Sequence, residues 1–290
     1  MSPQVTTAPP GHRARHAAEQ PRVTLSLGAI LVGCVVLVAL AAPILTPYAP
    51  QECAGSPYEP PSRAHLLGTD DVGHDNWTLL AFGARQSLLI GAGAALIATT
   101  MAVLVGVTAA LRPRGAGHLL MAAVDVLMAV PMLPLLLLIA ALVQPGPAGT
   151  ALVIGLLGWA VPARILRAQG LTVASSGYVS LARCFGGSTL YLLRRHVVPA
   201  IAPLVLATVV GQFGRSIGME ATLGFLGIGD PTRPSWGLLL RHALDDPGIW
   251  FTTRWVWWMG PPALAIAVLL IGCTLLAIAA ERRFDPRLKA

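Results

Sequence analysis

Composition excludes an ordinary soluble protein. The chain has 290 residues, of which 55% are hydrophobic and only 11% charged, whereas soluble domains carry about 25% charged residues. Together with a mean hydropathy of +0.69, this predicts a polytopic membrane protein. The net charge of +7 does not indicate nucleic-acid binding, because the basic residues lie in loops and do not alternate with aromatic ones.

Six apolar segments are long enough to cross a bilayer, whose hydrocarbon core of about 30 Å requires about 20 residues. The sequence therefore predicts an all-α membrane protein with six transmembrane helices. The predicted spans are residues 23–45, 88–111, 119–143, 148–166, 197–218 (with a possible continuation to 226) and 256–280.

The segments outside the spans divide the rest of the chain. Residues 1–22 are rich in Pro, Ala and basic residues and are predicted to be a disordered cytoplasmic tail. Residues 46–87 form an extracytoplasmic loop, residues 88–280 a core that includes a cytoplasmic loop at 177–196, and residues 281–290 a cytoplasmic tail.

Orientation follows from the basic residues, which concentrate on the cytoplasmic side of membrane proteins. The segments predicted to be inside carry Arg13, Arg15, Arg22, Arg112, Arg114, Arg164, Arg167, Arg183, Arg194, Arg195, Arg282, Arg283, Arg287 and Lys289. Those predicted to be outside carry only Arg63, Arg85, Arg233, Arg241 and Arg254. Both termini are therefore predicted to be cytoplasmic.

The loop at 46–87 contains a turn-rich stretch of polar residues without an evident nucleophile and base. Its members are His65, Gly68, Thr69, Asp70, Gly73, His74 and Asp75. We interpret the stretch as a shaped cap on the outer face, in preference to a surface that contacts substrate. Two His near two Asp also allow a nickel cluster, which we rank well below the structural interpretation, so no metal site is predicted.

Three ionisable residues lie within or near predicted spans: Asp125, Arg215 and Glu220. Such residues are functional candidates by default. Arg215 and Glu220 are five positions apart, about 140° around a helix, so they do not form a pair on one face. We favour pairing with other helices or another chain over a role in a transport pathway or gate.

The loop at 177–196, here called the knob, carries a pattern suited to docking. Tyr178, Val179, Leu181, Ala182 and Phe185 recur at helical spacing and give one apolar face. Gly186 and Gly187 end that helix. The alternative is an ordinary interhelical loop with a helix on the membrane surface.

A second short helix is expected after the two glycines. Ser188 can cap it over residues 189–195, and Pro199 suits the first turn of the next span. Arg183, Arg194, Arg195 and His196 surround the apolar face with basic groups. The two helices together can insert an apolar tip into a groove of another protein.

The knob resembles the cytoplasmic coupling loop of ABC-importer permeases, whose pattern is E-A-A, three residues, G, nine residues, I-x-L-P. Ser180, Leu181 and Ala182 stand at E-A-A, Gly186 at the glycine, and residues 196–199 at I-x-L-P. Ser180 replaces the family's Glu and Leu181 its first Ala. The chain therefore lacks that carboxylate but keeps the apolar residues and the glycine turn.

Three further segments resemble the dipeptide, oligopeptide and nickel permeases of the second-subunit type. HLLGTDDVGHDNWTLLAFGARQSLLIG at 65–91 resembles H-x-L-G-T-D-x-x-G-R-D…G-A-R-x-S-L-x-x-G, with His74 where Arg is usual. MEATLGFLGIGDPTRPSWGLLL at 219–240 resembles E-x-x-L-S-F-L-G-L-G…P-S-W-G, and residues 285–288 match D-P-R-L. These matches occur in order and cover most of the chain from His65 onward.

This resemblance implies the type I importer permease fold in a bacterial inner membrane. It implies a heterodimer with a homologous permease, two cytoplasmic ABC ATPase subunits, an extracytoplasmic substrate-binding protein and the lipid bilayer as partners. Short peptides are the expected cargo, with nickel or another metal chelate as the alternative. The knob residues, with Pro199, would transmit the ATPase movement.

Catalysis by the chain itself is not expected. It lacks the P-loop pattern GxxxxGK[ST], so ATP and Mg²⁺ would be used by partner subunits, and no cofactor is expected here. A secondary transporter or channel is an alternative of another class, but it would need inverted repeats or an ion site at the midplane. An intramembrane protease ranks last, because all seven His lie at or outside the ends of the predicted spans.

Overall fold

The computed structural model describes residues 11–112 and 115–284. Within these residues the chain is helical apart from loops and two isolated β-bridges. The α-helices are α1 (Gly11–Leu45), α2 (Asn76–Leu111), α3 (Ala116–Ala129), α4 (Met132–Val143), α5 (Pro147–Gly158), α6 (Ala160–Ala174), α7 (Gly177–Cys184), α8 (Thr189–Leu192), α9 (Val198–Phe225), α10 (Trp236–Asp245) and α11 (Gly260–Phe284). A π-helical turn, η1 (Leu193–Val197), and two 3₁₀ turns, η2 (Ile249–Phe251) and η3 (Thr253–Val256), complete the order.

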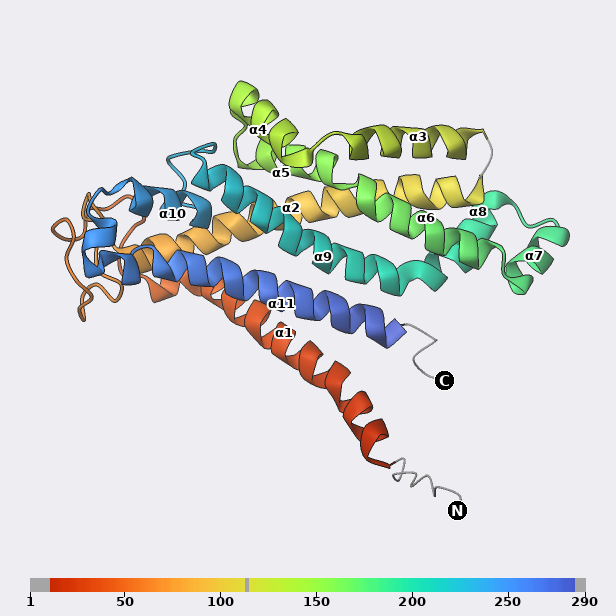
Figure 1. Cartoon of the computed structure of the whole chain (residues 1–290), viewed down its shortest axis with the longest axis horizontal. Helices are drawn as coiled ribbons and strands as arrows, with labels where there is room; N and C mark the ends of the chain where they lie inside the picture. Colours follow the sequence, from red (N-terminus) through yellow and green to blue (C-terminus); the bar gives the residue numbers. More distant parts are fainter. Residues whose placement is uncertain (1–10, 113–114, 285–290) are drawn as a thin grey trace, which may run out of the picture.

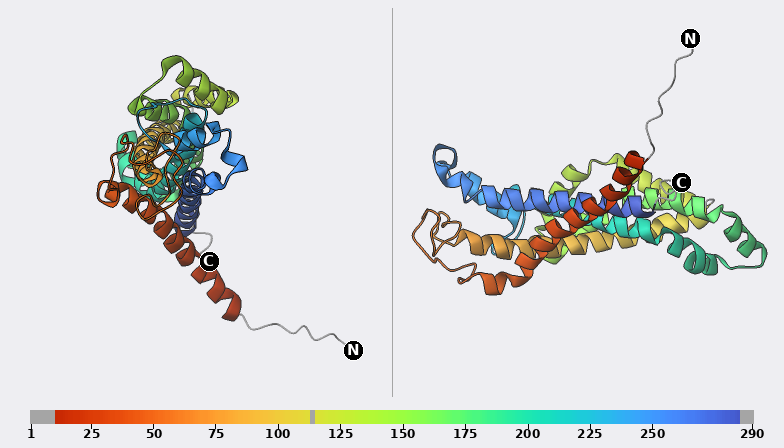
Figure 2. Two further views of the ribbon diagram at one scale, coloured as in Figure 1. Left: turned by 90° about the vertical axis from the view of Figure 1, so that its left-hand side faces the viewer. Right: turned by 90° about the horizontal axis from the view of Figure 1, so that it is seen from below.

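The predicted class of all-α membrane protein is confirmed. Four helical segments are long and apolar enough to cross a bilayer: Val23–Leu45, Asn76–Leu111, Leu193–Phe225 and Thr253–Glu281. Two bent pairs, α3 with α4 and α5 with α6, raise the number of crossings to six if each pair is one span. The bundle is elongated, with α10 and the loop before α2 at one end and α7 and α8 at the other (Figures 1 and 2).

The third predicted span is not one straight helix, because α3 and α4 meet at an angle of 82°. Pro131 lacks the N–H that would continue α3, and a residue before proline avoids helical dihedrals. Val130 accordingly adopts an extended conformation, with ψ of 128°.

The fourth predicted span is bent by 46° between α5 and α6 and continues beyond residue 166 to Ala174. Pro162 has no N–H to offer to the carbonyl of Gly158, four residues earlier. The side chain of Gln212, on α9, donates its Nε2 hydrogen to that carbonyl at 2.9 Å instead. An intramembrane carbonyl freed by proline is thus satisfied from a neighbouring helix.

Two predicted boundaries are wrong at helix starts. Residues 11–22 were expected to be disordered but belong to α1. Their Ala, Arg, Glu and Gln are good helix formers. Residues 1–10 of the predicted tail lie outside the described residues. The loop 46–87 ends at residue 75, because α2 begins at Asn76. We call residues 46–75 the cap loop.

Helix α2 is the centre of the bundle and packs against α1, α5, α6 and α9. Small buried residues along its length, including Ala84, Ala94, Ala98 and Ala102, let these neighbours approach closely, as is common in membrane helices. Helices α1 and α11 pack against each other and form one flank of the bundle (Figure 1). The first described residues of α1 and the last of α11 lie toward the end that carries the knob.

Candidate functional site

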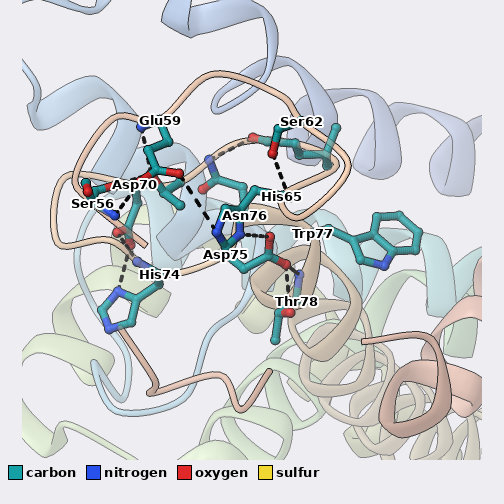
Figure 3. Close-up of polar contacts among 12 residues, drawn as sticks. Ser56, Glu59, Ser62, His65, Asp70, His74, Asp75, Asn76, Trp77 and Thr78 are labelled. Atoms are coloured by element: carbon teal, nitrogen blue, oxygen red, sulfur yellow. Dashed lines mark hydrogen bonds and ion pairs between the residues drawn. The ribbon is translucent and has the colours of Figure 1, made fainter. Parts of the chain in front are cut away.

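Asp70 organises the tip of the cap loop. Its Oδ1 accepts hydrogen bonds from the N–H groups of Val72, Gly73 and His74 at 2.8–2.9 Å, and its Oδ2 lies 2.8 Å from His74 Nδ1. Gly73 has a φ of +97°, which favours glycine, and a Cβ there would lie 2.3 Å from the carbonyl oxygen of Gly55. These contacts fix a compact turn (Figure 3).

Asp75 joins the cap loop to α2. Its Oδ2 accepts from the N–H and the hydroxyl of Thr78, both at 2.8 Å, and so caps the helix. Its Oδ1 lies 3.0 Å from Nδ1 of buried His65, which stacks on Tyr48. The loop is therefore anchored to the start of the central helix by a buried histidine–carboxylate pair.

The remaining residues of the predicted cap also hold the loop together. Thr69 donates its hydroxyl to the carbonyl of Ser56 at 2.7 Å and accepts from the N–H of Glu59 at 2.8 Å. The N–H of Ser56 donates to Glu59 Oε1 at 2.8 Å and holds the pKa of that carboxyl below its usual value. Gly68 has a φ of +64°, and a Cβ there would meet the carbonyl of Glu59 at 2.3 Å.

The two histidines of the cap loop do not share a site. Each is bonded to its own aspartate, and no group of three or more His, Cys, Asp or Glu in residues 11–112 and 115–284 is arranged to hold a metal ion. The donor set therefore gives no support to the nickel cluster considered from the sequence.

The knob begins with α7, which ends in a tight glycine turn. The N–H of Gly187 donates to the carbonyl of Ala182 and that of Gly186 to the carbonyl of Arg183, both at 3.0 Å. Gly186 has a φ of +83°. This is the Schellman arrangement, in which a left-handed residue reverses the chain and satisfies the last helical carbonyls. The helix break expected at this glycine pair is confirmed.

One face of the knob is buried and the other is open. The knob packs against the bundle through two buried residues, Val179 and Leu192, and through Val197, which follows it directly. On the open side, Phe185 is 88% exposed and Leu181 61% exposed. Exposed large apolar side chains of this kind occur where proteins contact other proteins or a membrane.

The second half of the knob turns directly into the next span. Ser188 Oγ accepts from the N–H of Tyr191 at 3.2 Å, so it caps α8 as expected. The predicted helix over 189–195 is only one turn long, because the backbone widens into the π-helical η1 before α9. His196 lies between the rings of Tyr178 and Tyr191, which ties α7 to this turn, and Pro199 lies in the first turn of α9.

The other predicted knob residues lie on α7 and η1. Ser180, Arg183, Arg194 and Arg195 are exposed and Ala182 is half-buried. No ion pair involving these arginines occurs in the part of the chain that the structure describes. Their charges are available to a partner.

The three intramembrane charges have different surroundings. Asp125 on α3 forms an ion pair with Arg164 on α6, a partner that the sequence did not suggest. Glu220 is 3% exposed and faces the hydroxyls of Ser87 on α2 and Ser235 at the start of α10. Arg215 is exposed and has no ion-pair partner within the described residues.

Arg215 lies at a cavity of about 280 Å³ beside the two helix bends. Gln212, Arg215, Ser216 and Met219 contribute one face of α9 to its wall. Sequence reasoning singled out Arg215 but missed Gln212 and Ser216. Arg215 and Ser216 follow Gln212 by three and four residues inside a span, and this spacing of polar residues was the available signal.

Comparison with known proteins agrees with this arrangement. Residues 102–290 match the family described as the inner membrane component of binding-protein-dependent transport systems. A Brucella suis protein named as a peptide transport system permease is 36% identical over 273 residues, which cover 92% of this chain and 89% of that protein.

A Pseudomonas aeruginosa protein named di/tripeptide transport system permease protein DppC is 34% identical over 271 residues, 90% of this chain and 88% of its own length. The family match begins near the end of α2 and includes the knob and α9, and the two relatives cover about nine-tenths of the chain. The chain therefore belongs to the family of inner membrane components of binding-protein-dependent transport systems.

Proposed function

We propose that this chain is a permease subunit of an ATP-driven importer of short peptides. The observation that carries the proposal is the folded cap loop at one end of the bundle and the exposed apolar knob at the other, in a chain whose relatives are named as peptide permeases. Because the knob exposes Leu181 and Phe185 and its arginines have no ion-pair partner among the described residues, it suits a groove in a motor subunit.

The proposed complex contains this chain, a homologous permease, two ATPase subunits that use ATP and Mg²⁺, and a binding protein that docks over the cap loop. ATP would close the ATPase pair, and the knob would pass that movement to α9 through η1. Transport is then alternating access, in which ATP and cargo each favour one of two states.

The cargo is tested with vesicles that hold the whole complex, with the binding protein on the cap-loop side. We expect peptide-loaded binding protein to raise ATP hydrolysis several-fold, because cargo delivery favours the state that closes the ATPases. A dipeptide library would be compared with nickel chelates and with unloaded binding protein. Stimulation by metal chelates alone would move the function to metal uptake, and no stimulation by any peptide would defeat the proposal.

Membrane orientation is tested with two native cysteines. Cys53 in the cap loop and Cys184 in the knob are both exposed, whereas Cys273 is buried. Cys34 is exposed too, but it lies within the apolar span Val23–Leu45, so it is replaced by serine in every sample. In right-side-out vesicles we expect a membrane-impermeant maleimide to label Cys53 at once, and Cys184 only after permeabilisation.

The Cys53→Ser and Cys184→Ser variants identify each label by its loss. Immediate labelling that disappears in the Cys184→Ser variant would place the knob outside and contradict a coupling role.

A further inference from the structure

One face of α9 presents a row of polar groups to the cavity beside the helix bends. Counted from Gln212, the next three of these residues follow at three, four and seven positions: Arg215, Ser216 and Met219. They therefore lie on one side of the helix. Met128 and Met132, on either side of the α3–α4 bend, supply part of the opposite wall. Methionine side chains are flexible and adapt to apolar groups of different shapes.

The charge of Arg215 requires water or an anion. The residue is ten positions from Phe225, the end of α9, which corresponds to a depth of about 15 Å along the helix. A cation exposed to lipid at such a depth is costly, so intramembrane arginines face water-filled cavities or partners. No carboxylate in the described part of the chain pairs with it.

Gln212 connects the same wall to the bend between α5 and α6. Gln212 is only 3% exposed, and its Nε2 donates a hydrogen bond to the carbonyl of Gly158. That bond fixes the amide orientation, since only the nitrogen can donate. The remaining atom, Oε1, is buried and has no hydrogen-bond partner among the described residues, so Arg215 is the charged group that this wall presents to the cavity.

We propose that this cavity binds the free carboxylate of the cargo through Arg215. The inference rests on the proposed function and names the chemistry that the permease itself recognises. A guanidinium can hold a carboxylate by two parallel hydrogen bonds. The methionines on the other wall would accept varied side chains, so the site would select for a peptide end and not for a sequence.

The test compares a dipeptide with its C-terminal amide in vesicles that contain the whole complex. Uptake of each is divided by the amount that the binding protein holds, which removes the binding protein's own preference. The variants are Arg215→Gln and Arg215→Lys, with Arg112→Gln as a control at the exposed end of α2. Complex assembly and basal ATP hydrolysis are measured for every variant.

We expect the wild type to carry the free acid about 10-fold to 100-fold faster than the amide, the range for a hydrogen bond to a charged group. The Arg215→Gln variant should lose this preference by slowing only the free acid. The Arg215→Lys variant should retain part of it, and Arg112→Gln all of it.

Two results would overturn the inference. If Arg215→Gln slows both peptides equally, Arg215 pairs with an anion of another chain. If it slows neither, the cavity does not bind the carboxylate. In both cases the wild-type complex still imports peptides, so the proposed function stands. A wild type that imports no peptide at all would defeat the function as well.

Discussion

Replacing Gly186 with aspartate is expected to reduce peptide uptake at least tenfold, while the protein still inserts and assembles. Gly186 occupies the left-handed region at φ of +83°, where a side chain costs roughly 1–2 kcal/mol. A Cβ there would meet no atom within 4 Å, so the strain falls on the turn alone. The chain can relieve it by moving Phe185 away from its docking position. Uptake and copurification of the ATPase subunits measure the two effects separately.

Gly177→Asp is the matched control for this variant. Gly177 begins α7, where a Cβ also meets no atom within 4 Å and no positive φ is required. An acidic residue in the first turn of a helix is favourable. Transport should therefore stay close to wild type. Equal transport by the Gly186→Asp variant would show that the turn does not couple the knob to a motor.

Replacing Gly237 with valine is expected to abolish a stable fold at the cap-loop end. A Cβ at Gly237 would lie 2.2 Å from the backbone oxygen of Ala221, so α10 would have to leave α9. Trp236, which is 2% exposed and donates its indole N–H to the carbonyl of Leu80 at 3.1 Å, would leave its site with it. We expect a loss of about 3–5 kcal/mol, as for removal of a buried aromatic.

The measurement is the temperature at which the detergent-purified protein leaves its monodisperse peak in size-exclusion chromatography. Gly229→Val is the control, because Gly229 lies in the loop between the same two helices and a Cβ there meets nothing within 4 Å. If both variants lose stability equally, the cause is the introduction of a β-branched residue in this region and not the contact between α9 and α10.

Local chemistry explains the features that could be predicted from the sequence. The glycine turn of the knob and the serine cap after it depend on a few neighbouring residues, as does Pro199 in the first turn of α9, and the structure confirms all three. Hydrophobic length predicted the apolar segments in the same way, because the bilayer imposes one thickness on every span.

Tertiary contacts account for what could not be predicted. The bend at Pro131 had a visible cause, but its 82° angle depends on what α4 packs against. The break at residue 159 is supported by Gln212, over fifty positions later in the chain. Asp125 and Arg164 are likewise distant in sequence and pair only because α3 and α6 lie together. Hydropathy averages carry no information on such pairs.

The contact between α1 and α11 has a consequence for biosynthesis. Gly28 on α1 lies close to α11. A Cβ added to Gly28 would be 3.0 Å from the backbone oxygen of Gly272. Helix α1 leaves the ribosome long before α11 and therefore meets it only after residue 260 has been made. At translation rates of about 5–20 residues per second, that wait lasts roughly ten to forty seconds.

During this interval the face of α1 that carries Gly28 is not covered by α11. A nascent chain that stops before α11 keeps that face uncovered, which marks it as unfinished for quality-control proteases in the membrane.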